Sequence, residues 1–117
     1  MQDRAITNKE WKNFFDSLSK SAKNNQIELE VSGFDIGYQV EGDWLDFEGI
    51  SYEPRLDTIH IHTSRIEHAI IHPLEVIVAL EHDAIVSLEI KDDDRTQILN
   101  FRPPVVLKEP SPREIHP

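Results

Sequence analysis

Polar and apolar residues alternate along most of the chain after residue 25, and many of the polar positions are acidic. The segment Ile27-Glu28-Leu29-Glu30-Val31 is the clearest case. Alternation with a period of two is typical of a β-strand that has one buried face and one solvated face. Between Glu28 and Asp57 there are nine acidic residues and one basic residue, Arg55. The chain is therefore predicted to build a sheet whose exposed face is strongly negative.

An amphipathic helix is predicted over residues 8–23, ahead of the strands. Thr7-Asn8-Lys9-Glu10 fits a capping box, in which Glu10 reaches back from the third helical position. Ile6 and Trp11 are placed for the hydrophobic staple that often accompanies this box. Apolar residues then recur at helical spacing and are expected to pack on the sheet. These residues are Trp11, Phe14, Phe15, Leu18 and Ala22.

Two polar segments are predicted to be hairpin turns between strands. Glu41-Gly42-Asp43 contains the glycine that short turns favour, and Lys91-Asp92-Asp93-Asp94-Arg95 separates two alternating segments. Gly49 is predicted to mark a bulge within the strand that covers residues 44–52. The pattern as a whole predicts an antiparallel meander of six to seven strands.

The expected fold class is therefore α+β, with an N-terminal helix packed on a curled antiparallel sheet or partial barrel. Residues 1–104 are predicted to form a single domain. From Pro103 to Pro117 there are five prolines and almost no alternation. Residues 105–117 are therefore predicted to be an extended or disordered tail.

Charge and composition exclude several classes of partner. The 117 residues carry a formal net charge of −10, which repels nucleic acid and anionic membranes, so neither is expected as a partner. The absence of cysteine excludes disulfides and thiolate chemistry. No apolar segment approaches membrane-spanning length, and the N-terminus lacks a signal-peptide pattern, so a cytoplasmic location is expected. A basic protein surface or a cation is compatible with this charge.

His60 and His62 form the most conspicuous chemical pattern. They project from one face of a predicted strand, a spacing that metal sites use, and His68 or Glu67 could supply a third ligand. The pattern is weak, because no helical zinc motif accompanies it and half-exposed histidines on a strand are common. We predict no metal site, no cofactor and no catalytic residue set.

The leading functional hypothesis is a non-enzymatic binding or interaction module that uses its acidic sheet face. Homo-oligomer formation along an edge strand is a second mode of interaction. The alternatives are a metal-dependent enzyme that uses His60 and His62, and a small-molecule carrier with a pocket between helix and sheet. Trp44 would be an anchor for a partner if it is exposed. The candidate binding residues are Glu28, Glu30, Trp44, Glu48, Tyr52, His60 and His62.

Several segments of the chain resemble a known bacterial family. The segments are EWKNFFDSLS, GFDIGYQVEGDWLDFEGISYEP, DTIHI and ILNFRPP, and the resemblance covers about residues 5–104. The family is domain-of-unknown-function family 5335, which consists of small proteins. The chain departs from it at Asp93-Asp94-Arg95, where a glycine is expected, and in its tail. The resemblance implies a single α+β domain and supplies neither an activity nor site residues.

Overall fold

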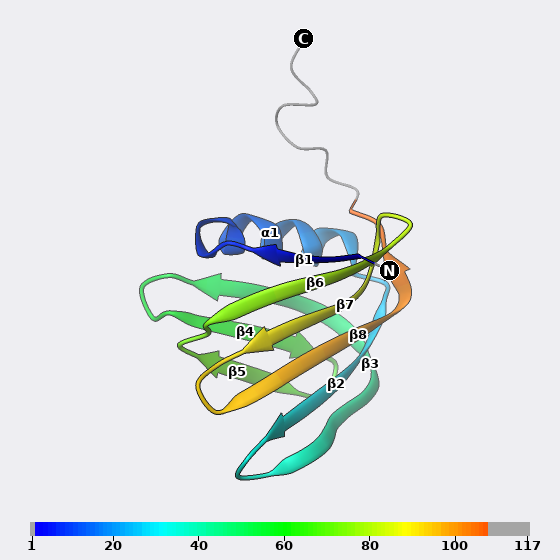
Figure 1. Cartoon of the computed structure of the whole chain (residues 1–117). Coiled ribbons are helices and arrows are strands. Elements are labelled where there is room, and N and C mark those ends of the chain that lie inside the picture. The colour runs from blue at the N-terminus through cyan, green and yellow to red at the C-terminus, as the bar shows by residue number, and fades with distance from the viewer. Residues whose placement is uncertain (1, 108–117) are drawn as a thin grey trace.

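The computed structural model describes residues 2–107. In this range the chain forms one helix and one open antiparallel sheet of eight strands, in the order β1-β6-β7-β8-β2-β3-β4-β5 (Figure 1). The α+β class and the N-terminal helix are thus confirmed. The elements are β1 (Gln2–Ile6), α1 (Asn8–Ser21), β2 (Gln26–Gly33), β3 (Gly37–Glu53), β4 (Thr58–Thr63), β5 (Glu67–Ile71), β6 (Glu75–Glu81), β7 (Ala84–Lys91) and β8 (Arg95–Val105).

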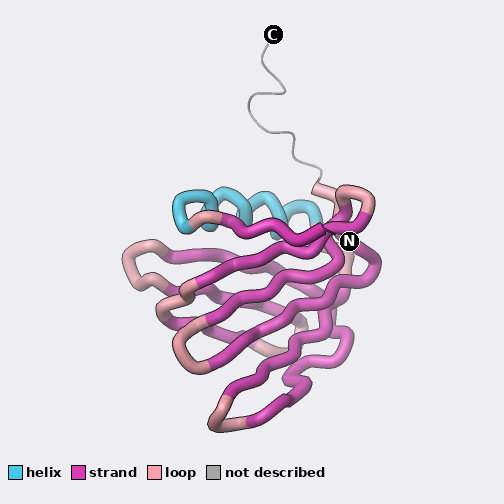
Figure 2. Tube along the Cα trace, in the orientation of Figure 1, coloured by secondary structure: helices cyan, strands magenta, loops and turns pink. Residues whose placement is uncertain are grey.

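The sheet folds back on itself along β3. The first half of β3 pairs with β2, and its second half pairs with β4. As a result β4 and β5 lie behind β6, β7 and β8, and the tube in Figure 2 shows the helix across one end of the curl. Buried side chains from both parts form the core, including Leu29, Ile59, Ile61, Leu88 and Leu99. Within the described part of the chain the curl does not close, and β1 and β5 remain as its two edges.

The predicted hairpin turn at Glu41–Asp43 is wrong, because these residues lie inside β3. The β2–β3 pairing contains two register shifts, which absorb the extra residues as irregularities in a continuous strand. Gly42 is buried there, and a Cβ on it would lie 2.9 Å from the Leu45 side chain. Trp44 has a φ of 53°, in the left-handed region. Gly42 therefore permits the Leu45 side chain to approach the backbone closely within a bent strand. The predicted bulge at Gly49 is confirmed by the register shift in the β3–β4 pairing.

The strand count and the connectivity also differ from a meander of six to seven strands. The structure has eight strands, because Gln2–Ile6 pairs with β6 as an additional edge strand. The last strand, β8, inserts between β7 and β2. β8 also continues to Val105, which is buried and paired with Ile85, so the ordered chain passes the predicted boundary at residue 104. The remainder of the predicted tail, residues 108–117, lies outside the described residues.

The helix begins and packs largely as its sequence predicts. The Glu10 carboxylate accepts hydrogen bonds from the Thr7 backbone N–H (3.2 Å) and hydroxyl (2.9 Å), which lower its pKa. The Trp11 indole N–H donates to the Ile6 carbonyl at 2.9 Å, which fixes the entry to the helix. Of the predicted apolar stripe only Phe14 differs, because it is half-buried at the margin of the stripe, whereas its neighbour Phe15 is fully buried.

A serine on α1 satisfies the backbone of β3 on the side where, within residues 2–107, no strand pairs with it. The Ser19 hydroxyl donates to the Ile50 carbonyl at 2.7 Å and accepts from the Ile50 N–H at 2.8 Å. Ile50 belongs to the half of β3 that pairs with β4 on its other side only. The helix therefore takes the place of a ninth strand at this point. Within residues 2–107, no helix is long and apolar enough to cross a membrane.

Candidate functional site

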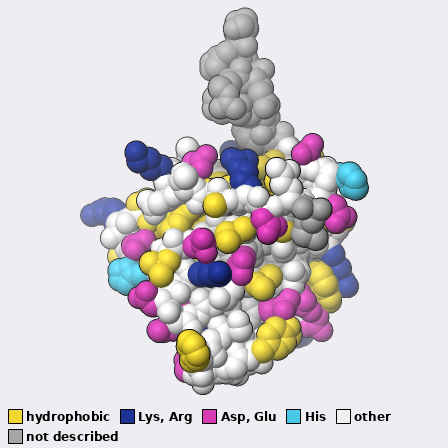
Figure 3. Space-filling model, viewed as in Figure 1, with side chains coloured by type: hydrophobic (Ala, Val, Ile, Leu, Met, Phe, Trp, Pro, Cys, Tyr) yellow, Lys and Arg dark blue, Asp and Glu magenta, His cyan; other side chains and the backbone are white. Residues whose placement is uncertain are grey.

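The strand register aligns acidic and apolar side chains on the outer face of the front part of the sheet. One row of paired positions runs Ile77–Glu89–Ile98–Glu30–Val40 across β6, β7, β8, β2 and β3. Figure 3 views this side of the molecule, where acidic and hydrophobic side chains are interleaved. We call this surface the acidic sheet face. It is defined by Glu28, Glu30, Val40, Ile77, Glu89 and Ile98.

Two glutamates at its centre are held by one amide. The Asn100 side-chain N–H₂ donates to Glu30 and, at 3.3 Å, to Glu28. Both carboxylates are half-buried. Loss of water around Glu28 and the neighbouring Glu30 charge raise the pKa of Glu28, and Asp43 adds to this effect. The charged form of Glu28 is therefore disfavoured by its surroundings, and a cation placed beside it would favour that form.

Aromatic side chains border these carboxylates. The Tyr38 hydroxyl donates to Glu30 at 2.6 Å, and this bond raises the pKa of Tyr38. The Arg102 guanidinium lies 4.3 Å from the centre of the Trp44 ring, within the range of a cation–π contact. Trp44 is half-buried. It is therefore not the freely exposed anchor that the sequence left open, because a residue of the same chain already covers its ring.

The other candidate binding residues lie elsewhere. Glu48 is exposed on the second half of β3, which pairs with β4. His60 and His62 are on the outer face of β4, with their rings stacked at a centroid distance of 6.2 Å. The structure therefore divides the seven predicted residues among separate surfaces, and it brings only Glu28, Glu30 and, at the border, Trp44 together.

Within residues 2–107, no third ligand lies beside the histidine pair in a metal-binding arrangement. Glu67 comes within 3.7 Å of His62 Nδ1, at the edge of an ion-pair contact. His68 has the opposite orientation on β5, beside the buried Gln97, and burial lowers the pKa of His68 despite the opposing effects of Gln97 and Glu41. Among residues 2–107, no group of three His, Asp or Glu side chains could hold a metal ion. The geometry therefore gives no support to the metal-enzyme alternative.

Tyr52 belongs to a polar cluster that the sequence did not reveal. Its hydroxyl donates to Asp57 at 2.6 Å, and Asp57 also lies 3.0 Å from His72 Nδ1. The Tyr52 bond, followed by the His72 contact, lowers the pKa of Asp57. Both Asp57 and His72 have left-handed backbones, with φ values of 48° and 55°. The cluster fastens the β3–β4 turn to the end of β5, and the Tyr52 ring packs edge-on against Trp11.

The hollow between α1 and the sheet has the wrong chemistry for an apolar ligand. It is an open depression, and most of the residues that line it are polar. An apolar carrier requires an enclosed cavity lined mainly by hydrophobic side chains. The residues that line it are Asn8, Lys9, Lys12, Asn13, Tyr52 and Pro54.

The fold and its surface define a small α+β domain with an open, curled antiparallel sheet and an acidic outer face. The chain belongs to a family of unknown function, DUF5335, whose model matches residues 2–110. It is similar to an uncharacterized protein of Aquifex aeolicus, with 35% identity over 111 residues, which covers 93% of this chain and 100% of the relative. Among solved structures, none matches the chain.

Proposed function

We propose that this chain is a non-enzymatic binding module and that its acidic sheet face binds a basic protein surface. The observation that carries the proposal is the row Ile77–Glu89–Ile98–Glu30–Val40, in which apolar and acidic side chains alternate across five strands. Such a surface offers apolar contact area and charge to the same partner. Specific interfaces combine both features, with charge setting the choice of partner.

The electrostatics favour a cationic partner over a neutral one. Glu28 and Glu30 share one amide donor and lie side by side on a half-buried surface, where loss of water and the Glu30 charge disfavour the charged form of Glu28. A lysine or arginine placed between them would remove this repulsion. The formal net charge of −10 also accelerates encounter with basic proteins at low ionic strength.

The proposal is tested by neutralising the face with Glu28→Gln, Glu30→Gln and Glu89→Gln in one variant. Binding of a fluorescent octalysine peptide is measured against ionic strength. The control, Asp16→Asn, Glu53→Gln and Glu81→Gln, removes the same charge from the helix and from the ends of β3 and β6. We expect affinity to fall about fivefold to tenfold more in the face variant than in the control at 0.01 M salt, where the Debye length is about 30 Å.

The salt dependence gives a second readout. The difference between the two variants should shrink as the Debye length falls to about 8 Å near physiological ionic strength. Equal losses of affinity in the two variants would show that only net charge matters. That result would refute the assignment of binding to the acidic sheet face.

A further inference from the structure

A second surface, separate from the acidic sheet face, lies along the edge strand β5. β5 pairs with β4, and within residues 2–107 no strand lies on its other side. Two backbone hydrogen bonds show which residue pairs of β4 and β5 are hydrogen-bonded to each other. The Thr63 N–H donates to the Ile66 carbonyl, and the His72 N–H donates to the Asp57 carbonyl, both at 2.9 Å. In an antiparallel pair, hydrogen-bonded positions alternate with positions that point away. The N–H and C=O groups of Glu67, Ala69 and Ile71 therefore point away from β4.

This edge carries few of the features that normally protect a strand from further pairing. Edge strands are usually protected by shortness, charged side chains (especially lysine), proline, bulges or a covering element. β5 is short and carries one acidic side chain, Glu67. β5 contains neither lysine nor proline, and all three residues with outward-pointing backbones have exposed side chains. At its end, Ile71 and Leu74 are each 62% exposed. The edge therefore offers both backbone hydrogen-bonding groups and apolar contact area.

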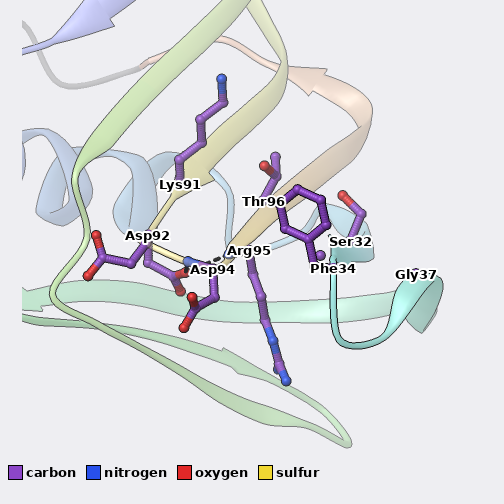
Figure 4. Close-up of a pocket in the computed structure, with 10 residues that line it drawn as sticks. Ser32, Phe34, Gly37, Lys91, Asp92, Asp94, Arg95 and Thr96 are labelled. Atoms are coloured by element: carbon purple, nitrogen blue, oxygen red, sulfur yellow. Dashed lines mark hydrogen bonds between the residues drawn. The ribbon is translucent and has the colours of Figure 1, made fainter.

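The turn between β7 and β8 forms the opposite wall of a shallow hollow along this edge. The hollow joins Ala69, Ile71 and His72 to Asp35 and to the turn Asp92–Arg95. Figure 4 shows this turn from the side where it adjoins the Phe34 loop. Most of the charged groups in the hollow are carboxylates, so the wall that faces β5 is negative.

Not all of these carboxylates are available to a ligand. Asp92 Oδ1 accepts the backbone N–H groups of Asp94 (2.9 Å) and Arg95 (2.8 Å), which shapes the turn. The Arg95 guanidinium is paired with Asp35 at 2.7 Å. Asp93 and Asp94 are exposed and, among residues 2–107, form no ion pair. These two carboxylates are the groups that a basic ligand would meet.

We propose that the free edge of β5 binds an extended basic peptide segment as an additional strand. The peptide backbone pairs with the outward-pointing groups between Glu67 and Ile71, and its lysine or arginine side chains contact Asp93 and Asp94. Strand addition to an exposed edge is a recurrent mode of peptide recognition, in which the backbone supplies affinity and the side chains supply specificity. A second copy of the chain is a poorer occupant, because its net charge of −10 opposes the approach to an acidic hollow.

The probe is a fluorescent, end-blocked heptapeptide that alternates lysine and valine. The matched control peptide has the same side chains but N-methylated amides at every second residue. The methyl groups remove the N–H donors along one side of the extended peptide. We expect at least a tenfold loss of affinity for the methylated peptide. Upon binding of the unmodified peptide, amide hydrogen exchange should slow at Glu67, Ala69 and Ile71. Equal affinity for both peptides, or unchanged exchange at all three amides, would overturn the proposal.

Protein variants locate the binding independently of the acidic sheet face. Asp93→Asn with Asp94→Asn should weaken binding about fivefold at low salt, as two exposed charge contacts predict. Ala69→Pro removes an N–H that points away from β4 and should abolish binding. If that variant fails to fold, Ile71→Lys leaves the backbone intact and should weaken binding by charge repulsion. Unchanged affinity in the folded variants would refute the proposal.

Two further results separate this inference from the proposed function. Neutralising Glu28, Glu30 and Glu89 should leave the protection of the β5 amides by the heptapeptide unchanged, whereas its loss would assign the effect to the sheet face. Sedimentation of the protein alone should show a monomer. A dimer that is lost in the Ile71→Lys variant would instead assign the edge to a second copy and overturn the proposal.

Discussion

Removal of one hydroxyl, in Ser19→Ala, should destabilise the protein far more than a typical change on a helix surface. This hydroxyl makes two hydrogen bonds to Ile50, at 2.7 and 2.8 Å, and Ile50 is only 2% exposed. Alanine would leave both backbone groups without that partner on the side of β3 that has no neighbouring strand. A buried polar group left without a partner costs about 1–3 kcal/mol.

We therefore expect a loss of about 2–4 kcal/mol in the free energy of unfolding. This is a large fraction of the roughly 5–15 kcal/mol available to a domain of this kind. At roughly 4–8 °C per kcal/mol, it corresponds to a decrease of about 8–32 °C in Tm. Urea denaturation measures the free energy, and hydrogen exchange at the Ile50 amide measures the local effect.

Two control variants make the experiment specific. Ser17→Ala changes a half-exposed serine on the same helix and should be neutral or slightly stabilising, because alanine has the higher helix propensity. Ser19→Thr retains a hydroxyl and should recover part of the lost stability. A Ser19→Ala protein within about 0.5 kcal/mol of Ser17→Ala, with unchanged exchange at Ile50, would refute the argument that the helix replaces a strand here.

Three further predictions concern the core and the ends of the sheet. Phe15→Ala should cost about 3–5 kcal/mol in urea denaturation and Phe14→Ala clearly less, because Phe15 is fully buried and Phe14 is not; equal costs would contradict this packing. A chain that ends at residue 104 should be less stable than one that ends at residue 107 by about 1.5–3 kcal/mol, since only the longer chain buries Val105; equal melting temperatures would contradict this. Burial lowers the pKa of His68, so the unfolded state binds the proton of this side chain more readily than the folded state does. The contribution of neutral His68 to the free energy of unfolding should therefore be fully present above pH 6.5 and should be lost as the pH falls from 6.5 toward the lower folded-state pKa. The pH dependence of urea denaturation should lose this component in His68→Gln and keep it in His60→Gln.

Local patterns in the sequence predict the features that depend on neighbouring residues. The capping box at Thr7 and Glu10 locates the start of the helix, and the turn after Lys91 lies where the polar segment predicts it. Alternation also assigns Glu28 and Glu30 correctly to the outer side of β2, opposite the buried Leu29. In each case the residues that decide the structure are within a few positions of one another.

Features that depend on distant partners were not predictable in this way. Glu41–Asp43 has the composition of a turn, and only its pairing with β2 reveals a bend within a strand. The strand Gln2–Ile6 exists through its pairing with β6, whose paired residues lie 70 to 78 positions later in the chain. The contact of Asp57 with His72 and the bonds of Ser19 with Ile50 likewise join segments that no local pattern connects. The candidate surfaces also depend on such pairing, which explains why only part of the predicted residue set was brought together.

The position of β8 constrains how the protein can be made on the ribosome. β8 is the last strand in the chain, yet it lies between β7 and β2, and it joins the hairpins on either side. Until residues 95–105 have left the exit tunnel, a nascent chain holds β6–β7 and β2–β3–β4 as separate groups, each with an unpaired edge. Folding is thus postponed to the end of translation, and a chain truncated by a premature stop codon would expose two open edges to chaperones and proteases.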